Sequence, residues 1–321
     1  MLFYFYIFIF LVAIVSLGVS SGMVARALLK LGRIVGLNEC VLSFMLLGII
    51  TSLPEIFIAT ASVITNNPLL SIGNIIGANF TNITLAIGLV AYLSGGIDLS
   101  GQVSKRVFWI SFMLVLMPSF LVLGGGLSRF DGLLLCLMFL AYIIVFSYDG
   151  QFLEKSAPHV PYGVHYFSEV YPSLINLTLG LLILVLSSIF IILFTAGLTS
   201  YWPIDLILFS TVVLGLATTL PELFFGMRGA IMQHSSLAMG NILASTVFNS
   251  TVIIGLLAIV SPTATNSLTA GPVILTSSFT FLAFILLSVF SYTGSRINRT
   301  EGVLLMSLYF LFITSASALY L

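Results

Sequence analysis

Two glutamates, Glu55 and Glu222, each follow a proline inside a long apolar stretch. They belong to a repeated motif: residues 48–82 align with residues 215–249 without a gap, at a constant offset of 167 residues. A repeat of this length indicates two halves of one architecture. A carboxylate deep in an apolar span costs several kcal/mol unless it is satisfied. Two unrelated buried glutamates would not share matching surroundings, so the pair indicates one shared cation site.

The repeated proline predicts a break in each helix that carries a glutamate. Neither Pro54 nor Pro221 can donate a backbone hydrogen bond to the carbonyl four residues earlier, and Gly48 and Gly215 loosen the preceding turn. Hydroxyl groups stand at the same level in both copies, on Thr51, Ser52, Thr218 and Thr219. A simple proline kink would explain the break, but it would not explain why hydroxyl, hydroxyl, Leu, Pro, Glu occurs twice.

The helix after each glutamate predicts a partner face. Asn74, Ala78 and Asn82 are four residues apart, so they share one helix face. The second copy has the same spacing in Asn241, Ser245 and Asn249. Small residues beside these positions allow close helix packing. We therefore expect this face to bring amide and hydroxyl oxygens to the glutamates.

All these candidate ligands are oxygens, and they carry a formal charge of −2. The set contains no His or Cys, which argues against zinc and copper. Ca²⁺ takes six to eight flexible oxygens at about 2.3–2.6 Å, whereas Mg²⁺ prefers a rigid octahedral site and keeps its water. Small oxygen pockets also suit Na⁺. The chemistry of the repeat thus favours Ca²⁺ and Na⁺.

The composition places this site in a membrane protein. The chain has 321 residues, is 60% hydrophobic and only 6% charged, and has a mean hydropathy of +1.22. Soluble domains carry about 25% charged residues. The net charge is zero, so neither nucleic acid nor a protein partner is implied. We expect the lipid bilayer to be the surroundings of the chain.

Ten segments are apolar and long enough to span a bilayer, which takes about 20 residues as a helix. Their unbroken apolar runs predict helices rather than barrel strands, which would alternate. The first segment continues past the length of a signal-peptide core and is interpreted as a retained span. The predicted spans are residues 2–22, 39–64, 70–94, 106–124, 130–148, 173–196, 204–231, 236–261, 272–292 and 300–320.

The position of the repeat within these spans predicts two inverted halves. Five spans separate Glu55 from Glu222, and an odd number of crossings turns the second copy upside down. The predicted fold is an all-α integral membrane protein with residues 1–150 and 173–321 as inverted five-helix repeats and 151–172 as a connecting cytoplasmic loop. Inverted repeats with helices broken at the bilayer midplane are typical of secondary transporters.

Basic residues predict the orientation, because cytoplasmic loops are enriched in Lys and Arg. With both termini outside, the outer loops hold only Arg129. The cytoplasmic loops then hold Arg26, Lys30, Arg33, Lys105, Arg106, Lys155, Arg228, Arg296 and Arg299. We therefore expect a multi-pass protein of the cell membrane with both termini extracellular.

The paired motifs TSLPE…GNIIGAN and TTLPE…GNILAST resemble the two α repeats of the sodium/calcium exchanger family, within the cation/calcium antiporters. The resemblance covers both repeats and the ten-helix layout. It implies alternating access, with Na⁺ moving one way and Ca²⁺ the other, and no cofactor. The metal ligands that it implies are Glu55, Glu222, Asn82, Asn249, Thr51, Ser52, Thr218, Thr219 and Ser245, with the backbone carbonyls of Gly48 and Gly215.

The chain departs from the family pattern at several of these positions. The family often has serine where this chain has Ala78, and the loss of that oxygen would remove or weaken one Na⁺ site. Some relatives carry an acid in place of Asn249. The glycine that often precedes Thr-Ser is here Ile50, and its counterpart is Ala217.

Three other functions follow from the same residues. In H⁺/Ca²⁺ exchange, Glu55 and Glu222 would trade protons for the metal, and the missing hydroxyl at Ala78 favours this variant. A cation channel also uses carboxylates within the membrane, but inverted halves with broken helices favour alternating access. An intramembrane enzyme would need a nucleophile and base or a metal with histidines, whereas all three histidines fall in or near loops. We therefore predict a transporter and not an enzyme.

Overall fold

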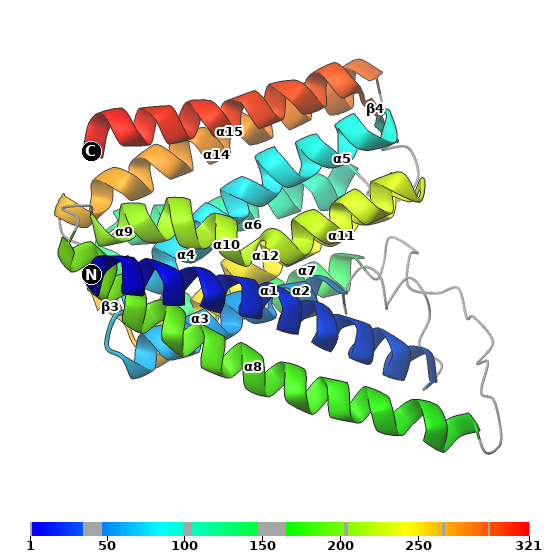
Figure 1. Ribbon diagram of the computed structural model, residues 1–321. Helices are drawn as coiled ribbons and strands as arrows, with labels where there is room; N and C mark the ends of the chain where they lie inside the picture. Colours follow the sequence, from blue (N-terminus) through cyan, green and yellow to red (C-terminus); the bar gives the residue numbers. More distant parts are fainter. Residues whose placement is uncertain are drawn as a thin grey trace.

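The protein is described by a computed structural model that covers residues 2–34, 47–98, 105–146, 165–201, 205–264, 267–294 and 296–320. Nearly all of these residues are helical (Figure 1). The helices of the first half are α1 (Leu2–Ile34), α2 (Leu47–Thr51), α3 (Leu53–Ile64), α4 (Pro68–Thr81), η2 (Asn82–Ala86), α5 (Ile87–Ser94), α6 (Lys105–Leu123) and α7 (Arg129–Phe146). Those of the second half are α8 (His165–Tyr201), α9 (Leu206–Phe209), η4 (Ser210–Leu214), α10 (Gly215–Thr218), α11 (Leu220–Ile231), α12 (Ser235–Phe248), η5 (Asn249–Ile253), α13 (Ile254–Val260), α14 (Ser267–Gly294) and α15 (Arg299–Tyr320).

Six of these helical segments are long and apolar enough to cross a membrane, and a seventh is formed if the bent pair Leu206–Thr218 and Leu220–Ile231 is one span. Leu53–Ile64 and Phe108–Leu123 are shorter apolar helices. The all-α, multi-pass class is therefore confirmed, while the number of ten spans stays a prediction. The beginning of the predicted span 39–64 lies outside the described residues. Helix α8 already begins at His165 and runs through Pro172, where the sequence predicted a loop.

Both helices that carry the glutamates are broken where the prolines predict it. The first breaks at Ser52, between α2 and α3, and the second at Thr219, between α10 and α11. The two parts of the second helix are bent by 41°. Each proline occupies the first turn of the new helix, where a missing N–H costs no intrahelical bond.

The two copies of the motif form matching elements. The bounds of α3, α4 and η2 recur in α11, α12 and η5 at the same offset of 167 residues as the motif. Two residues beyond the end of each broken helix lies a residue in the left-handed conformation, Asn66 (φ 57°) or Gln233 (φ 64°). Asn is among the residues that tolerate this conformation best. The repeated sequence therefore forms a repeated local structure, including the π-helical turn at its end.

The segments that follow the glutamates form the interior of the molecule. In the continuous helices Pro68–Ser94 and Ser235–Val260, 83% of the residues in the apolar window are buried, against 33% in the outer helices α1, α8 and α15. Helices α1 and α8 pack along each other at one side of the bundle, and α14 and α15 lie at the other (Figure 1). The outer helices expose apolar side chains, as expected of surfaces that face lipid.

Two short antiparallel strand pairs join distant loops. At one pair, β1 (Ile97–Asp98) bonds with β4 (Arg296–Ile297), and at the other, β2 (Gly126–Leu127) bonds with β3 (Thr263–Ala264). Figure 1 places β3 near both chain termini and β4 at the opposite end of the helices. Each pair links a loop of the first half with a loop of the second.

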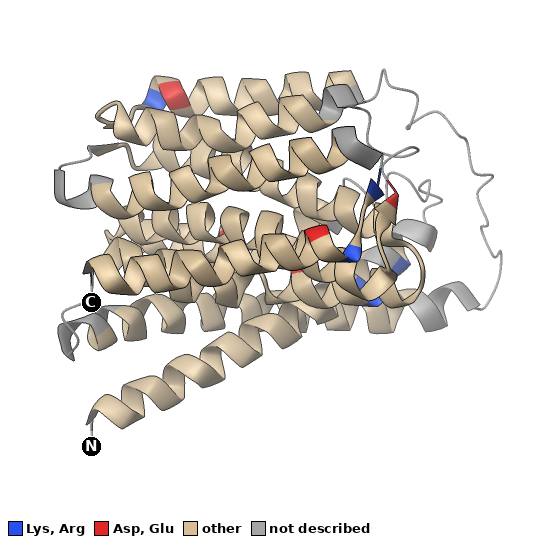
Figure 2. Ribbon diagram, turned by 90° about the horizontal axis from the view of Figure 1, so that it is seen from above, with Lys and Arg blue, Asp and Glu red and all other residues tan. Residues whose placement is uncertain are grey.

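The charged residues gather mainly at one end of the bundle (Figure 2). Arg296 belongs to β4 and donates to the carbonyl of Gly95, so it lies at the end opposite the termini. Arg129 directly follows Ser128 at the other strand pair. Arg296 and Arg129 thus lie at opposite ends of the bundle, as the sequence predicted from the distribution of basic residues among the loops.

Candidate functional site

The predicted ligand side chains are all buried in the middle of the bundle. Glu55 and Glu222 are both 0% exposed, although a charged side chain is almost never fully buried without a partner. The amides and hydroxyls are at most 1% exposed; they are Thr51, Ser52, Asn82, Thr218, Thr219, Ser245 and Asn249. Gly48 and Gly215 are buried as well. The structure thus places every predicted ligand out of contact with solvent.

A chain of oxygen atoms connects the two halves through Ser245. Ser245 Oγ lies 2.9 Å from Glu222 Oε1, to which it donates. It also lies 2.8 Å from Ser52 Oγ, on the broken helix of the first half. Ser52 Oγ in turn donates to the carbonyl oxygen of Gly48 at 2.9 Å. Four of the predicted ligands are therefore in direct contact, and they come from both copies of the motif.

Glu55 differs from Glu222, although the two occupy equivalent positions. Both carboxylate oxygens of Glu55 are without a hydrogen-bond partner among the described residues. The position equivalent to Ser245 is Ala78, whose methyl group offers no hydrogen bond. An unsatisfied buried carboxylate oxygen is costly, and Glu55 has two of them, whereas Glu222 has one, Oε2. The site is symmetric in sequence position but not in its hydrogen bonds.

The two carboxylates are close enough to interact electrostatically. Thr218 lies beside Glu55, and Thr51 lies beside Glu222. Each hydroxyl also has an acceptor besides the acid, because Thr51 Oγ1 lies 3.3 Å from the Gly48 carbonyl oxygen and Thr218 Oγ1 lies 3.2 Å from Asn74 Oδ1. The lone pairs of both hydroxyls therefore remain for an ion. Each glutamate is thus flanked by a threonine of the other repeat.

Close helix contacts at the glycines hold the two broken helices against the partner helices. A Cβ on Gly48 would lie 3.0 Å from Ala244 Cβ and 3.1 Å from the backbone nitrogen of Ser245. A Cβ on Gly215 would lie 2.7 Å from the carbonyl carbon of Gly77 and 2.8 Å from the nitrogen of Ala78. The two contacts are equivalent, and each broken helix touches the partner helix of the opposite repeat.

Asn82 and Asn249 begin the π-helical turns η2 and η5. Both side-chain heteroatoms of each amide lack a hydrogen-bond partner in the described part of the chain. Helix α11, which carries Glu222, contacts η2, and α3, which carries Glu55, contacts η5. Each amide therefore belongs to a turn that packs on the helix carrying the glutamate of the other repeat. The structure shows no direct bond between them and the other predicted ligands.

The donor set contains only oxygen atoms. Within the described ranges, no group of three His, Cys, Asp or Glu side chains is arranged to hold a metal ion. The two glutamates are instead surrounded by hydroxyls, amides and carbonyls. Such a set suits hard cations that exchange their ligands readily, such as Ca²⁺ and Na⁺, and does not suit zinc.

The site also contains residues beyond the predicted ligands. The helical spacing predicted that Asn74 lies on the same face of α4 as Ala78, and its oxygen accepts a hydrogen bond from Thr218. Asn79 and Ser250 form a second buried link between the halves, with Asn79 Nδ2 2.7 Å from Ser250 Oγ. Their equivalents are Thr246 and Ile83. The pair is not repeated, so an argument from the repeat could not find it.

Comparisons with known proteins identify the family of this chain. The family model described as "Sodium/calcium exchanger protein" matches residues 5–148 and 172–317. The "Putative antiporter CaxA" of Alkalimonas amylolytica is 26% identical over 302 residues, covering 92% of this chain and 93% of that protein. The "Sodium/calcium exchanger MaX1" of Methanosarcina acetivorans is 24% identical over 347 residues, covering 95% and 96%. These relatives are named as transporters and not as enzymes.

Two solved structures share the fold. The sodium-calcium exchanger NCX_Mj superposes with a TM-score of 0.68 at 20% sequence identity, covering 98% of this chain and 99% of that chain. The H⁺/Ca²⁺ exchanger CAX superposes with a TM-score of 0.74 at 18% identity, covering 96% and 82%. Since the family model matches both halves of the sequence, this chain belongs to the sodium/calcium exchanger family.

Proposed function

We propose that this protein is an antiporter that exchanges Na⁺ for Ca²⁺ across the membrane by alternating access. The observation that carries the proposal is the buried pair Glu55 and Glu222, on the broken helices of two repeats, and these repeats are in contact through Ser52 and Ser245. One Ca²⁺ neutralises both carboxylates, and Na⁺ ions replace it on the same oxygens. The proposed ligands are the predicted ones, including Asn82, Asn249 and the carbonyls of Gly48 and Gly215.

The reciprocal contacts of the two repeats support an inverted arrangement with ten spanning helices. Gly48 packs on Ser245 as Gly215 packs on Ala78, and Figures 1 and 2 both place the two termini at the same end of the helices. An even number of spans requires this placement. We propose residues 1–150 and 173–321 as the two halves, with both termini extracellular and the end that carries Arg296 in the cytoplasm.

Breaks in the two helices give alternating access a physical basis. Each break separates a short helix, α2 or α10, from the helix that carries the glutamate. Each short helix is held against the opposite repeat through a glycine. A movement of one broken helix therefore changes the oxygens around both acids. Because the halves are equivalent, the same site can be exposed first to one side of the membrane and then to the other.

Exchange of Ca²⁺ for protons is the second candidate, and the hydroxyl chain favours it. Three close oxygen contacts run from Glu222 through Ser245 and Ser52 to the Gly48 carbonyl. The two serines supply only two protons for these contacts. A proton on the Glu222 carboxyl group would supply the third and complete the chain. The unsatisfied oxygens of Glu55 are a second place for a proton.

The test is ⁴⁵Ca²⁺ uptake into proteoliposomes that contain the purified protein, with either internal Na⁺ or an imposed pH gradient as the only driving force. Uptake driven by internal Na⁺ without a pH gradient would establish Na⁺/Ca²⁺ exchange. Uptake driven by the pH gradient alone would overturn the assignment of Na⁺ and establish the second candidate. Flux that needs no counter-ion gradient would contradict antiport and indicate a channel.

A further inference from the structure

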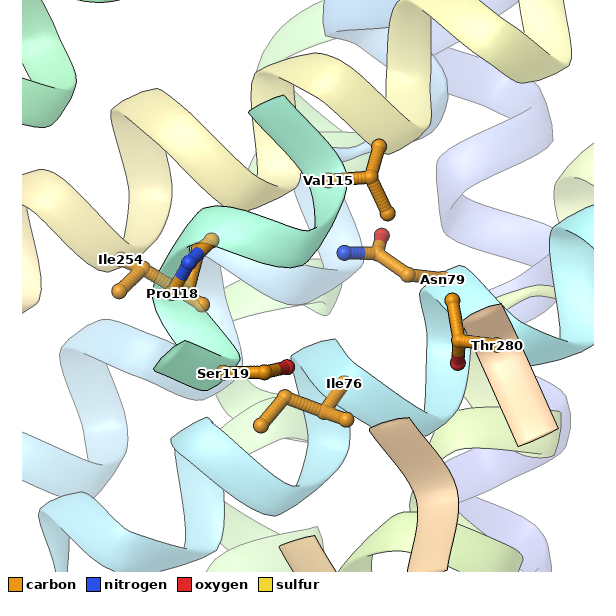
Figure 3. Close-up of a pocket in the computed structure, with 7 residues that line it drawn as sticks. All are labelled: Ile76, Asn79, Val115, Pro118, Ser119, Ile254 and Thr280. Carbon is orange, nitrogen blue, oxygen red and sulfur yellow. The ribbon is translucent and has the colours of Figure 1, made fainter. Parts of the chain in front are cut away.

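A small cavity lies apart from the two glutamates, where α4 meets α6, α13 and α14. It is lined by Ile76, Asn79, Val115, Pro118, Ser119, Ile254 and Thr280 (Figure 3). Its volume of about 10 Å³ is close to that of one water-sized sphere. The lining is mixed, since three of the seven side chains end in polar groups.

Asn79 is a buried polar side chain at the cavity, and one of its two polar atoms lacks a hydrogen-bond partner among the described residues. It is 3% exposed, and its Nδ2 donates to Ser250 Oγ at 2.7 Å. Ser250 Oγ in turn donates to the Val115 carbonyl at 3.5 Å, so it must accept the proton from the amide. This sequence of bonds assigns the nitrogen of Asn79 to Ser250. Asn79 Oδ1 is then an acceptor without a partner among the described residues.

The other polar groups at the cavity come from two more helices. Ser119 on α6 is 5% exposed, and Figure 3 shows its hydroxyl pointing into the space between α6 and α4. Thr280 on α14 donates its proton to the Thr276 carbonyl and so presents lone pairs. Pro118, inside α6, cannot donate to the carbonyl of Leu114. The groups around the cavity are mainly acceptors.

We propose that this cavity is a binding site for one buried water molecule that joins α4, α6 and α14. The water donates a hydrogen bond to Asn79 Oδ1 and accepts one from the Ser119 hydroxyl. Its second proton goes to Thr280 Oγ1. These three bonds match the number that buried waters typically make, and they satisfy the orphan acceptor, whose burial is otherwise costly.

A water fits these groups better than a sodium ion. All the lining side chains are neutral, so no acidic group offsets the cost of burying an ion there. The number of polar side chains on the cavity suits the two to four partners of a buried water.

The direct test is a structure of the full-length protein in lipid at a resolution that shows ordered water. We expect one density peak within about 2.7–3.0 Å of both Asn79 Oδ1 and Ser119 Oγ. Absence of a peak, with neighbouring ordered waters visible, would overturn the proposal. A peak with five or six oxygens at about 2.4 Å that disappears without Na⁺ would also overturn it and identify an ion.

A double-mutant cycle gives a second test that does not depend on resolution. Ser119→Ala and Thr280→Val each remove one water partner, and their hydroxyls share no direct hydrogen bond. If both bind the same water, their joint effect on the unfolding equilibrium constant in mixed micelles should depart at least about twofold from the product of the single effects. The control pair is Ser119→Ala with Ser288→Ala, because Ser288 bonds to Phe284 on its own helix. Equal, multiplicative behaviour in both cycles would contradict a shared water.

Discussion

Ser52 and Ser245, which are 193 residues apart in the chain, lie with their hydroxyl oxygens 2.8 Å apart between the two repeats. Ser245 also binds Glu222, so the contact joins the broken helix of one half to the acid of the other. The equivalent contact cannot form on the opposite side, because the residue there is Ala78. This difference between the halves leads to the first two predictions.

Ser245→Ala should weaken Ca²⁺ transport. The change removes one proposed ligand and leaves Glu222 without its hydroxyl donor. A hydrogen bond to a charged group contributes about 1.5–3 kcal/mol, so the apparent KM for Ca²⁺ in proteoliposomes should rise about tenfold or more. Ser62→Ala is the matched control, since its buried hydroxyl bonds to Ala59 in its own helix. A KM within twofold of the unchanged protein would exclude Ser245 from the site.

Ala78→Ser should increase the response to Na⁺. The added hydroxyl would stand opposite Glu55 as Ser245 stands opposite Glu222, and it would supply the missing oxygen. We expect the Na⁺ concentration for half-maximal exchange to fall roughly tenfold, which corresponds to about 1.4 kcal/mol. Ala91→Ser places a hydroxyl in the core of α5 as a control. An unchanged Na⁺ dependence would mean that Ala78 does not determine the Na⁺ sites.

Asn82→Leu should separate function from stability. Both heteroatoms of this amide lack partners among the described residues, and replacing an unsatisfied buried polar group with an apolar one of similar shape is neutral or stabilising. We expect an unchanged or higher thermal midpoint together with at least a tenfold loss of exchange. Asn79→Leu is the contrast, because it breaks the bond to Ser250 and should lower the midpoint. A loss of stability in Asn82→Leu would indicate a structural role for Asn82.

Gly77→Ala should destabilise the packing of α4 on the second broken helix. A Cβ there would overlap the backbone carbonyl of Thr211, and backbone cannot move aside as a flexible side chain can. Overpacking of this kind costs about 1–3 kcal/mol, measurable as a lower thermal midpoint. Gly18→Ala is the control, since a Cβ on Gly18 meets nothing within 4 Å and alanine favours a helix. Equal midpoints for the two variants would contradict the close contact.

The sequence predicted the features that depend on local chemistry and repeat in both halves. The proline breaks appear at Ser52 and Thr219, because a missing N–H acts within one helical turn. The helix faces that carry Asn74 and Ser245 follow from the helical period alone. The fold class followed from the apolar content of the chain.

The features that the sequence did not predict depend on pairings between distant segments. The pair Asn79 with Ser250 has no counterpart in the repeat, and the strand pair Ile97 with Ile297 shows no local pattern. Two-residue strands are too short to show an alternation of apolar and polar residues. The sequence predicted only part of the difference between Glu55 and Glu222. Ala78 indicated that one hydroxyl is missing, but the contacts of Ser245 with Glu222 and Ser52 depend on how the helices pack.

The most direct test of the account is equilibrium binding of ⁴⁵Ca²⁺ to the purified protein and to its Glu55→Gln, Glu222→Gln and double variants, without any ion gradient. Each glutamine keeps the shape of the side chain and removes its charge. We predict saturable binding to the unchanged protein, a loss of at least a hundredfold in affinity for each single variant, about 2.7 kcal/mol, and no binding to the double variant. Unchanged binding to the folded double variant would contradict the assignment of Glu55 and Glu222 as the cation site.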